Sequence, residues 1–171
     1  HELYNTCSSQ KEIIKACFLG NPDKYRGQFL KELAENGVLL DVYGNNWNKF
    51  VNHPNINIFE TVRGDDFWLT LSKYRVQLNL IRPHTLDTHN MRSFEIPGIG
   101  GIQLAPQSTD HLIYFEEDKE IFIYSGVRDC VVKIKKILSL SKQEAQKIRL
   151  QARKRSLESN YTYKARAIKA L

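Results

Sequence analysis

Short apolar runs alternate with amphipathic stretches along most of the chain. Residues 13–19, 38–43 and 76–81 are apolar runs of the length expected for buried strands. Residues 22–36, between the first two runs, carry apolar side chains at the spacing of one helix face, and Gly37 follows. A strand, a helix and a second strand in series need a crossover connection, so the pattern predicts parallel strands joined in the right-handed sense.

The same alternation continues to the end of the chain, with a polar loop expected after residue 106. Asn21 and Pro22 suit the N-cap and the first position of the first helix. Strands alternating with helices predict an α/β fold with a Rossmann-like, doubly wound parallel sheet in three α/β/α layers. The further elements expected are strands at 56–59 and 121–124, helices at 64–71 and 125–138, a long helix opened by the capping box at 141–144, and a last helix at 161–171.

The 171 residues suffice for one domain with a sizeable core. Residues 1–12 are expected to be a linker, and residues 13–171 the domain. The chain opens with His1 and its single methionine is Met91, so we expect a piece of a longer or processed protein. Its three scattered cysteines fit no metal-binding spacing, which predicts reduced thiols in a cytoplasmic protein.

The net charge of +6 is concentrated near the C-terminus. Residues 127–171 hold 13 Lys and Arg against 3 Asp and Glu, a charge of +10, and the rest of the chain holds 12 against 16, a charge of −4. The basic helices are either a solvated face or a surface for an acidic partner domain, an anionic membrane or nucleic acid. Only Tyr161 and Tyr163 offer rings for stacking there, so nucleic acid is the less favoured partner.

Residues 87–105 concentrate the candidate chemistry. Asn90 suits the N-cap of a helix that starts at Met91, and Pro97 with the glycines after it makes this helix short. A helix start after a strand binds anions through its free N–H groups, and Arg92 adds a cation in the first turn.

Two carboxylates, Asp87 and Glu95, bracket this helix start. Carboxylates hold ribose and sugar hydroxyls in charge-assisted hydrogen bonds, so one acid would bind a ribose and the other a sugar beyond a diphosphate. The competing interpretation is an ordinary ion pair between Arg92 and Glu95 one turn apart.

Open parallel sheets bind ligands at the carboxyl ends of their strands. Cations in loops at those ends would stabilise the charge that develops on a diphosphate leaving group. No D-x-D pair is present to hold a metal ion, and neither a P-loop nor a G-x-G-x-x-G follows the first strand. The nucleotide-binding candidates are Gly20, Asn21, Arg26, Arg63, His89, Asn90, Met91, Arg92 and Glu95.

Several short motifs together resemble the C-terminal, donor-binding half of two-domain GT-B glycosyltransferases of the group 1 type, in the branch of spore-maturation-protein-like transferases. They are F-L-G-N-P at 18–22, Y-G-x-x-W at 43–47, the acids eight apart with N-x-R-x-F-E at 90–95, and Y-x-x-R at 163–166. The family usually carries Glu at both acid positions, whereas this chain has Asp87 at the first. Pro97 also departs from the family, which has a small helix-forming residue there.

The resemblance implies a nucleotide-sugar-binding domain of a metal-independent, retaining hexosyltransferase, with Asp87 and Glu95 as catalytic residues. It implies no cofactor besides the nucleotide-sugar donor, which is a substrate, and a missing N-terminal domain that binds the acceptor. The chain alone is then expected to be inactive. Two alternatives remain from the sequence: a flavodoxin-like or receiver-type regulatory domain, although no acidic cluster follows the first strand, and a basic nucleic-acid-binding domain.

Overall fold

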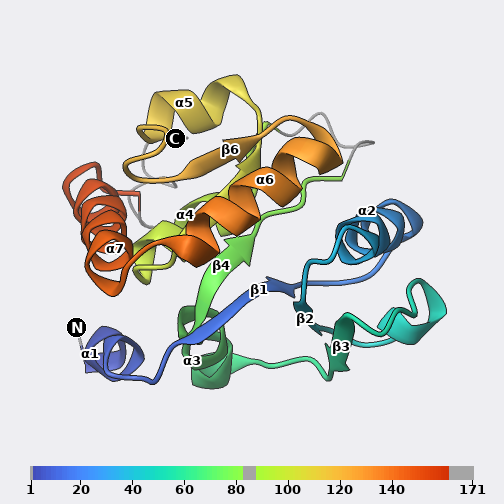
Figure 1. Ribbon diagram of the computed structural model, residues 1–171. Helices are drawn as coiled ribbons and strands as arrows, with labels where there is room; N and C mark the ends of the chain where they lie inside the picture. Colours follow the sequence, from blue (N-terminus) through green and yellow to red (C-terminus); the bar gives the residue numbers. More distant parts are fainter. Residues whose placement is uncertain (1, 83–87, 162–171) are drawn as a thin grey trace, which may run out of the picture.

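A six-stranded, all-parallel sheet forms the centre of the molecule (Figure 1). The computed structural model describes residues 2–82 and 88–161. The strand order is β3-β2-β1-β4-β5-β6, which confirms the predicted doubly wound, Rossmann-like sheet. The strands are β1 (Ile13–Leu19), β2 (Leu40–Tyr43), β3 (Ile56–Phe59), β4 (Tyr74–Leu78), β5 (Gln103–Pro106) and β6 (Phe122–Tyr124).

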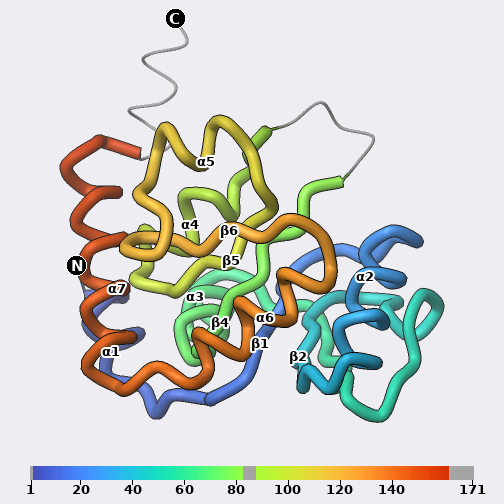
Figure 2. The backbone as a smooth tube through the Cα atoms, turned by 45° about the horizontal axis from the view of Figure 1, so that its top comes forward, coloured from blue at the N-terminus to red at the C-terminus, as the bar shows by residue number. Residues whose placement is uncertain are grey.

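Helices cover both faces of the sheet, as three α/β/α layers require (Figure 1 and Figure 2). Along β1, Ala16 and Phe18 join one core and Cys17 and Leu19 the other, as the two-residue period of a strand dictates. The first core packs against α2 and α6, and the second against α1, α3 and α4. The helices are α1 (Glu2–Ser8), α2 (Lys24–Glu35), α3 (Gly64–Lys73), α4 (Arg92–Gly98), α5 (Thr109–Tyr114), α6 (Gly126–Ser139) and α7 (Lys142–Glu158), with a 3-10 turn η1 at Trp47–Lys49.

Two segments differ from the elements expected of them. Part of the expected linker is the helix α1, which packs Cys7 into the same core as Leu71 of α3. Seven residues are too few for a stable isolated helix, so tertiary packing supports it and the local sequence carries little signal. The expected polar loop after residue 106 contains α5, whose first turn is capped by the Ser108 side chain accepting from the N–H of His111.

Element boundaries also move by a few residues. The central strand β4 begins at Tyr74 and ends at Leu78, earlier than the predicted 76–81. The N-cap of α2 is Asp23, whose carboxylate accepts from the N–H of Arg26, and not Asn21. The capping box that opens α7 at Ser141 and Glu144 is confirmed. The predicted helix at 161–171 lies, beyond its first residue, outside the described residues.

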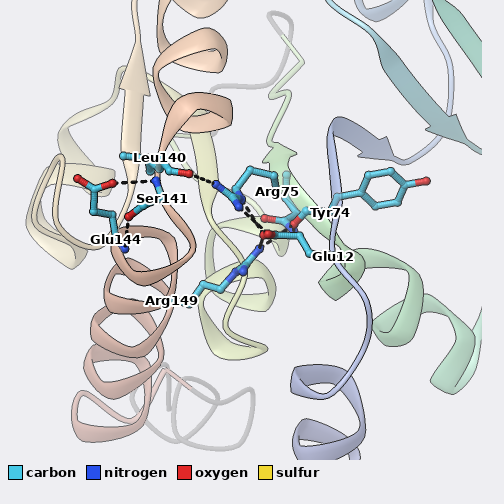
Figure 3. A network of polar contacts seen from close by, with 8 residues as sticks. Glu12, Tyr74, Arg75, Leu140, Ser141, Glu144 and Arg149 are labelled. Atoms are coloured by element: carbon cyan, nitrogen blue, oxygen red, sulfur yellow. Dashed lines mark hydrogen bonds and ion pairs between the residues drawn. The ribbon is translucent and has the colours of Figure 1, made fainter.

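A partly buried ion cluster joins the start of the sheet to the last described helix (Figure 3). Glu12, just before β1, accepts from Arg75 of β4 at 2.7 and 2.5 Å and from Arg149 of α7 at 2.5 Å. Arg75 also donates to the carbonyl of Leu140, and Arg149 donates to that of Tyr74. One carboxylate therefore holds two guanidiniums, and each guanidinium reaches a further backbone segment.

Glu12→Gln keeps the shape of this side chain and removes its charge. The two guanidiniums would lose their counter-ion, so we expect the free energy of unfolding at pH 7 to fall by about 2–3 kcal/mol, somewhat less than for fully buried pairs. Burial raises the pKa of Glu12, but Arg75 and Arg149 outweigh it and lower the pKa overall. The stabilisation is therefore present at neutral pH and is lost as the pH falls through the folded-state pKa. Urea unfolding at several pH values measures both effects.

Glu158→Gln is the matched control. Its pair with Lys154 is 3.8 Å long and mostly exposed, so its removal should change the free energy of unfolding by less than about 0.5 kcal/mol. Equal effects of the two substitutions at neutral pH would show that the Glu12 cluster does not stabilise the fold.

Candidate functional site

A pocket lies where the strand order changes direction. β2 and β3 lie on one side of β1, and β4 to β6 lie on the other, so the crevice between β1 and β4 opens at their carboxyl ends. A pocket of about 300 Å³ occupies this place. Six of the residues predicted to bind the nucleotide line this pocket: Gly20, Asn21, Arg26, Asn90, Met91 and Arg92. The pocket is also lined by residues that were not among the nucleotide-binding candidates: Tyr43 and Gly44, which belong to the Y-G-x-x-W motif, and Thr61, Val62, Phe67 and Asn79.

The turn before α4 is closed by reciprocal hydrogen bonds. The Asn90 side chain accepts from the N–H of Ser93, and the N–H of Asn90 donates to the Ser93 hydroxyl. The N-cap of α4 is Met91 and not Asn90, because α4 begins at Arg92, one residue later than predicted. Asn90 closes the turn from the position before this N-cap. The N–H groups of Phe94 and Glu95 are bonded to the carbonyl of Met91. These four amides are used within the turn, which shifts the recognition of an anion toward side chains.

Arg92 connects three elements at the pocket wall. Its Nε and Nη2 donate to the carbonyl of Leu19, the last residue of β1, at 3.3 Å each. Its guanidinium carbon lies 4.4 Å from the ring centre of Phe67 on α3, and its Nη1 pairs with Glu95. Arg92 therefore both lines the pocket and fixes α4 against the end of β1.

The two predicted acids have different outcomes. Glu95 forms the ion pair with Arg92 that the sequence offered as the competing interpretation. Glu95 is not among the residues that line the pocket. Its predicted contact with a ribose stays a prediction. Asp87 lies outside the described residues, so its predicted role also stays a prediction.

A second cationic group borders the pocket on the α2 side. Arg26 donates to the carbonyls of Leu80 (2.6 Å) and Asn21 (3.1 Å), which joins the loops after β4 and β1. Arg82 pairs with Asp23 at 3.0 Å, and the same carboxylate lies 3.8 Å from Arg26. Burial, and then the neighbouring charge of Arg82, lower the pKa of Arg26, but not enough to discharge a guanidinium. Two guanidiniums therefore contact the same carboxylate on this side of the pocket.

Close backbone contacts form the wall of the pocket near Gly20 and Gly44. The indole N–H of Trp47 donates to the carbonyl of Gly20 at 2.9 Å. Gly44 has φ +150°, and a Cβ there would lie 2.4 Å from this carbonyl oxygen. Only glycine lets the end of β2 approach the end of β1 so closely.

The remaining predicted residues lie beside the pocket. Arg63 is exposed at the N-cap of α3, next to the lining residue Val62. His89 precedes Asn90, and its Nδ1 lies 2.6 Å from Asp110 of α5. Neither residue lines the pocket.

A buried polar network behind the turn was not foreseen. The Asn79 side chain, fully buried at the end of β4, donates to the Ser93 hydroxyl and accepts from the Asn90 side chain. The Nε2 of His111 lies 2.8 Å from the same hydroxyl. Asn79 was a signal available in the sequence, because it and Gln77 are the polar residues of the run 76–81. Nothing local to His111 indicated its place, because it arrives from a helix that the apolar pattern did not reveal.

Within residues 2–82 and 88–161, no group of three or more His, Cys, Asp or Glu side chains is arranged to hold a metal ion. In the same ranges no helix is both long and apolar enough to cross a lipid bilayer. The basic side chains predicted near the C-terminus lie largely on α6 and α7, and several are exposed.

Comparisons with solved structures show the same fold in glycosyltransferases. Sucrose-phosphate synthase from Thermosynechococcus elongatus superposes with a TM-score of 0.71 at 11% identity, over 99% of this chain and 46% of its own. The C-terminal domain of a glycosyl transferase group 1 family protein from Francisella tularensis superposes with a TM-score of 0.67 at 11% identity. The match covers 95% of this chain and 92% of that domain. Anabaena HepE, in complex with UDP and glucose, superposes with a TM-score of 0.67 at 12% identity. The match covers 92% of this chain and 50% of HepE.

The chain spans less than half the length of the first structures it matches. No curated protein sequence matches it. A family model described as "Glycosyl transferase-like" matches residues 26–171, a span that includes most of the pocket residues and all of α4 to α7. The chain therefore belongs to the glycosyl transferase-like family, and its fold is that of the C-terminal domain of a GT-B glycosyltransferase.

Proposed function

We propose that this chain is the donor-binding domain of a metal-independent, retaining hexosyltransferase, and that its pocket binds a nucleotide sugar. The observation that carries the proposal is the pocket between β1 and β4, bordered by Arg26 and Arg92. A structure with the same fold is a complex with UDP and glucose, which supports this class of ligand. The motifs at 87–95 support the retaining outcome through their resemblance to the group 1 type.

The proposed role of the two arginines is to bind the diphosphate. When the bond between the sugar and the diphosphate breaks, negative charge grows on the leaving oxygen. Cations that are already held in place stabilise that charge without reorganisation. Arg26 and Arg92 are held by backbone carbonyls, Leu80 and Asn21 for the first and Leu19 for the second. They would therefore do the work that a divalent metal does in other transferases.

Glu95 and Asp87 are proposed to bind the ribose and the transferred sugar, respectively. Glu95 already balances Arg92, so its carboxylate can act on the donor in two ways. It binds the ribose hydroxyls directly, or it sets the position of Arg92 against the diphosphate. The two routes differ in which part of the ligand they affect.

Transfer is proposed to require a second domain. The chain spans less than half of the first matching structures, and the acceptor would bind in the part that is missing. The basic side chains of α6 and α7 are then proposed to face that domain or an anionic membrane surface. We expect this chain to bind donor nucleotides weakly and to transfer no sugar by itself.

Glu95→Gln tests the ribose contact. Loss of a charge-assisted hydrogen bond costs roughly 1.5–3 kcal/mol, so binding of UDP or GDP should weaken by about tenfold or more, measured by calorimetry. Pyrophosphate, which has no ribose, separates the two routes. Equal weakening for pyrophosphate and UDP would assign Glu95 to the positioning of Arg92, and unchanged UDP and GDP binding would remove it from the site. Glu35→Gln, in an exposed pair with Lys31, is the matched control.

Asp87→Asn tests the sugar contact. It should weaken the binding of a nucleotide sugar and leave the affinity for the bare nucleoside diphosphate unchanged, because the proposed partner is the sugar. NMR titrations with UDP-glucose and UDP measure the two affinities on the same sample. An equal loss for both ligands would contradict the assignment.

Gly44→Ala tests the shape of the pocket. The added methyl group would meet the Gly20 carbonyl at 2.4 Å and the Trp47 indole at 2.8 Å. Overpacking of this kind costs about 1–3 kcal/mol, and here it also displaces two backbone segments that line the pocket. We expect both a lower unfolding midpoint in urea and weaker UDP binding.

Gly98→Ala is the control for this substitution, because nothing lies within 4 Å of the added carbon and its φ is not positive. It should leave UDP binding unchanged. If Gly44→Ala binds UDP as tightly as the parent chain, the nucleotide does not occupy this pocket.

A further inference from the structure

His111 is a fully buried residue of α5 with a hydrogen bond on each ring nitrogen. Its Nδ1 lies 3.0 Å from the carbonyl oxygen of Pro106, at the end of β5. A carbonyl oxygen only accepts, so Nδ1 carries the proton and donates. In the neutral ring, Nε2 is then an acceptor, and it lies 2.8 Å from the hydroxyl of Ser93. The backbone of β5 thus selects the tautomer that accepts from Ser93.

The Ser93 hydroxyl has only one arrangement that satisfies its neighbours. It accepts from the side chain of Asn79 and from the N–H of Asn90, both at 3.1 Å. Its own hydrogen is left for the Nε2 of His111. Asn79 and Asn90 are also bonded to each other at 2.7 Å, and both line the pocket. Hydrogen bonds through Ser93 therefore link the pocket wall to His111, which does not itself line the pocket.

We propose that His111 is a positioning residue of the donor site: it orients the Ser93 hydroxyl, which in turn fixes Asn79 and the Asn90 turn. The donor part of this inference rests on the proposed function. The fixing of the turn rests on the hydrogen bonds alone.

A neighbouring residue strengthens the link between α5 and this turn. Asp110 accepts from Thr88 and faces His89 at 2.6 Å, just before the turn begins. Two successive residues of α5 therefore hold residues 88–93 at two points.

The arrangement also makes the site sensitive to acid. Burial lowers the pKa of His111, with the Pro106 hydrogen bond acting in the opposite direction, His89 lowering it further and Asp110 raising it. Below that pKa the ring carries a proton on both nitrogens, and Nε2 no longer accepts from Ser93. The turn would then lose its fixed arrangement.

Two substitutions each remove one of the two hydrogen bonds of His111 and keep the other. Gln places its amide near the position of Nε2, so His111→Gln keeps an acceptor for Ser93 and gives up the bond to Pro106. Asn places its amide near Nδ1, so His111→Asn keeps the bond to Pro106 and gives up the acceptor. Each variant loses one buried hydrogen bond, so urea unfolding should report similar stabilities for the two. A difference between them at the site is then not an effect of global stability.

The first readout needs no ligand. Amide hydrogen exchange of the Asn90 and Ser93 N–H groups reports the turn directly. We expect exchange about fivefold or more faster in His111→Asn, the effect of one lost hydrogen bond, and close to the parent in His111→Gln. Unchanged exchange in His111→Asn, or equal acceleration in both variants, would overturn the proposal.

The second readout is UDP affinity across pH. At neutral pH, UDP should bind His111→Asn about fivefold more weakly than His111→Gln. As the pH falls below the ordinary histidine pKa, the affinity for UDP should fall more steeply for the parent than for His111→Gln. Protons taken up by UDP itself cancel in this comparison. Parallel pH profiles would overturn the link to the donor site.

The outcomes keep the two proposals apart. If the parent binds neither UDP nor GDP while exchange is still faster in His111→Asn, the proposed function fails and the fixing of the turn stands. If the parent binds UDP but the two variants bind it equally, the proposed function stands and His111 is not a positioning residue.

Discussion

The contact between Arg92 and the last carbonyl of β1 is the constraint on which the site depends. A doubly wound sheet opens a crevice beside β1, because the chain leaves the strands there in opposite directions. Left alone, the end of β1 would present a carbonyl to that crevice. Arg92 satisfies the carbonyl of Leu19 from α4 and packs on Phe67 of α3. It thereby sets the width of the crevice and gives its wall a cation.

The two sides of the pocket differ in their electrostatics. On the α4 side, Glu95 balances Arg92, so a ligand meets a nearly neutral pair with oriented donors. On the α2 side, Arg26 and Arg82 both contact Asp23. The proposed diphosphate would meet a guanidinium on each side. Arg92 is paired with Glu95, and Arg26 shares Asp23 with a second arginine.

Much of the fold could be predicted from the sequence, since apolar runs of strand length set both the strands and their parallel arrangement. The pocket could be placed because strand ends in such a sheet converge, which brought Gly20, Arg26 and Arg92 together from distant positions. The helices α1 and α5 could not be predicted, because helices this short are stabilised by tertiary packing. His111 was missed with α5. The ion pair between Glu95 and Arg92 was one of two interpretations, since spacing along a helix cannot distinguish an ion pair from a ligand contact.

The ion cluster at Glu12 has a consequence for how the chain folds. Glu12 and Arg149 are 137 residues apart, so this contact closes nearly the whole chain into a loop. Contacts of such separation form late, because the entropy of closing the loop must be overcome before the contact stabilises anything. During synthesis, the amino-terminal strand would emerge long before α7 is available to it. Glu12 and Arg75 would then pair first, and the arrival of Arg149 would complete the domain as one of its last steps.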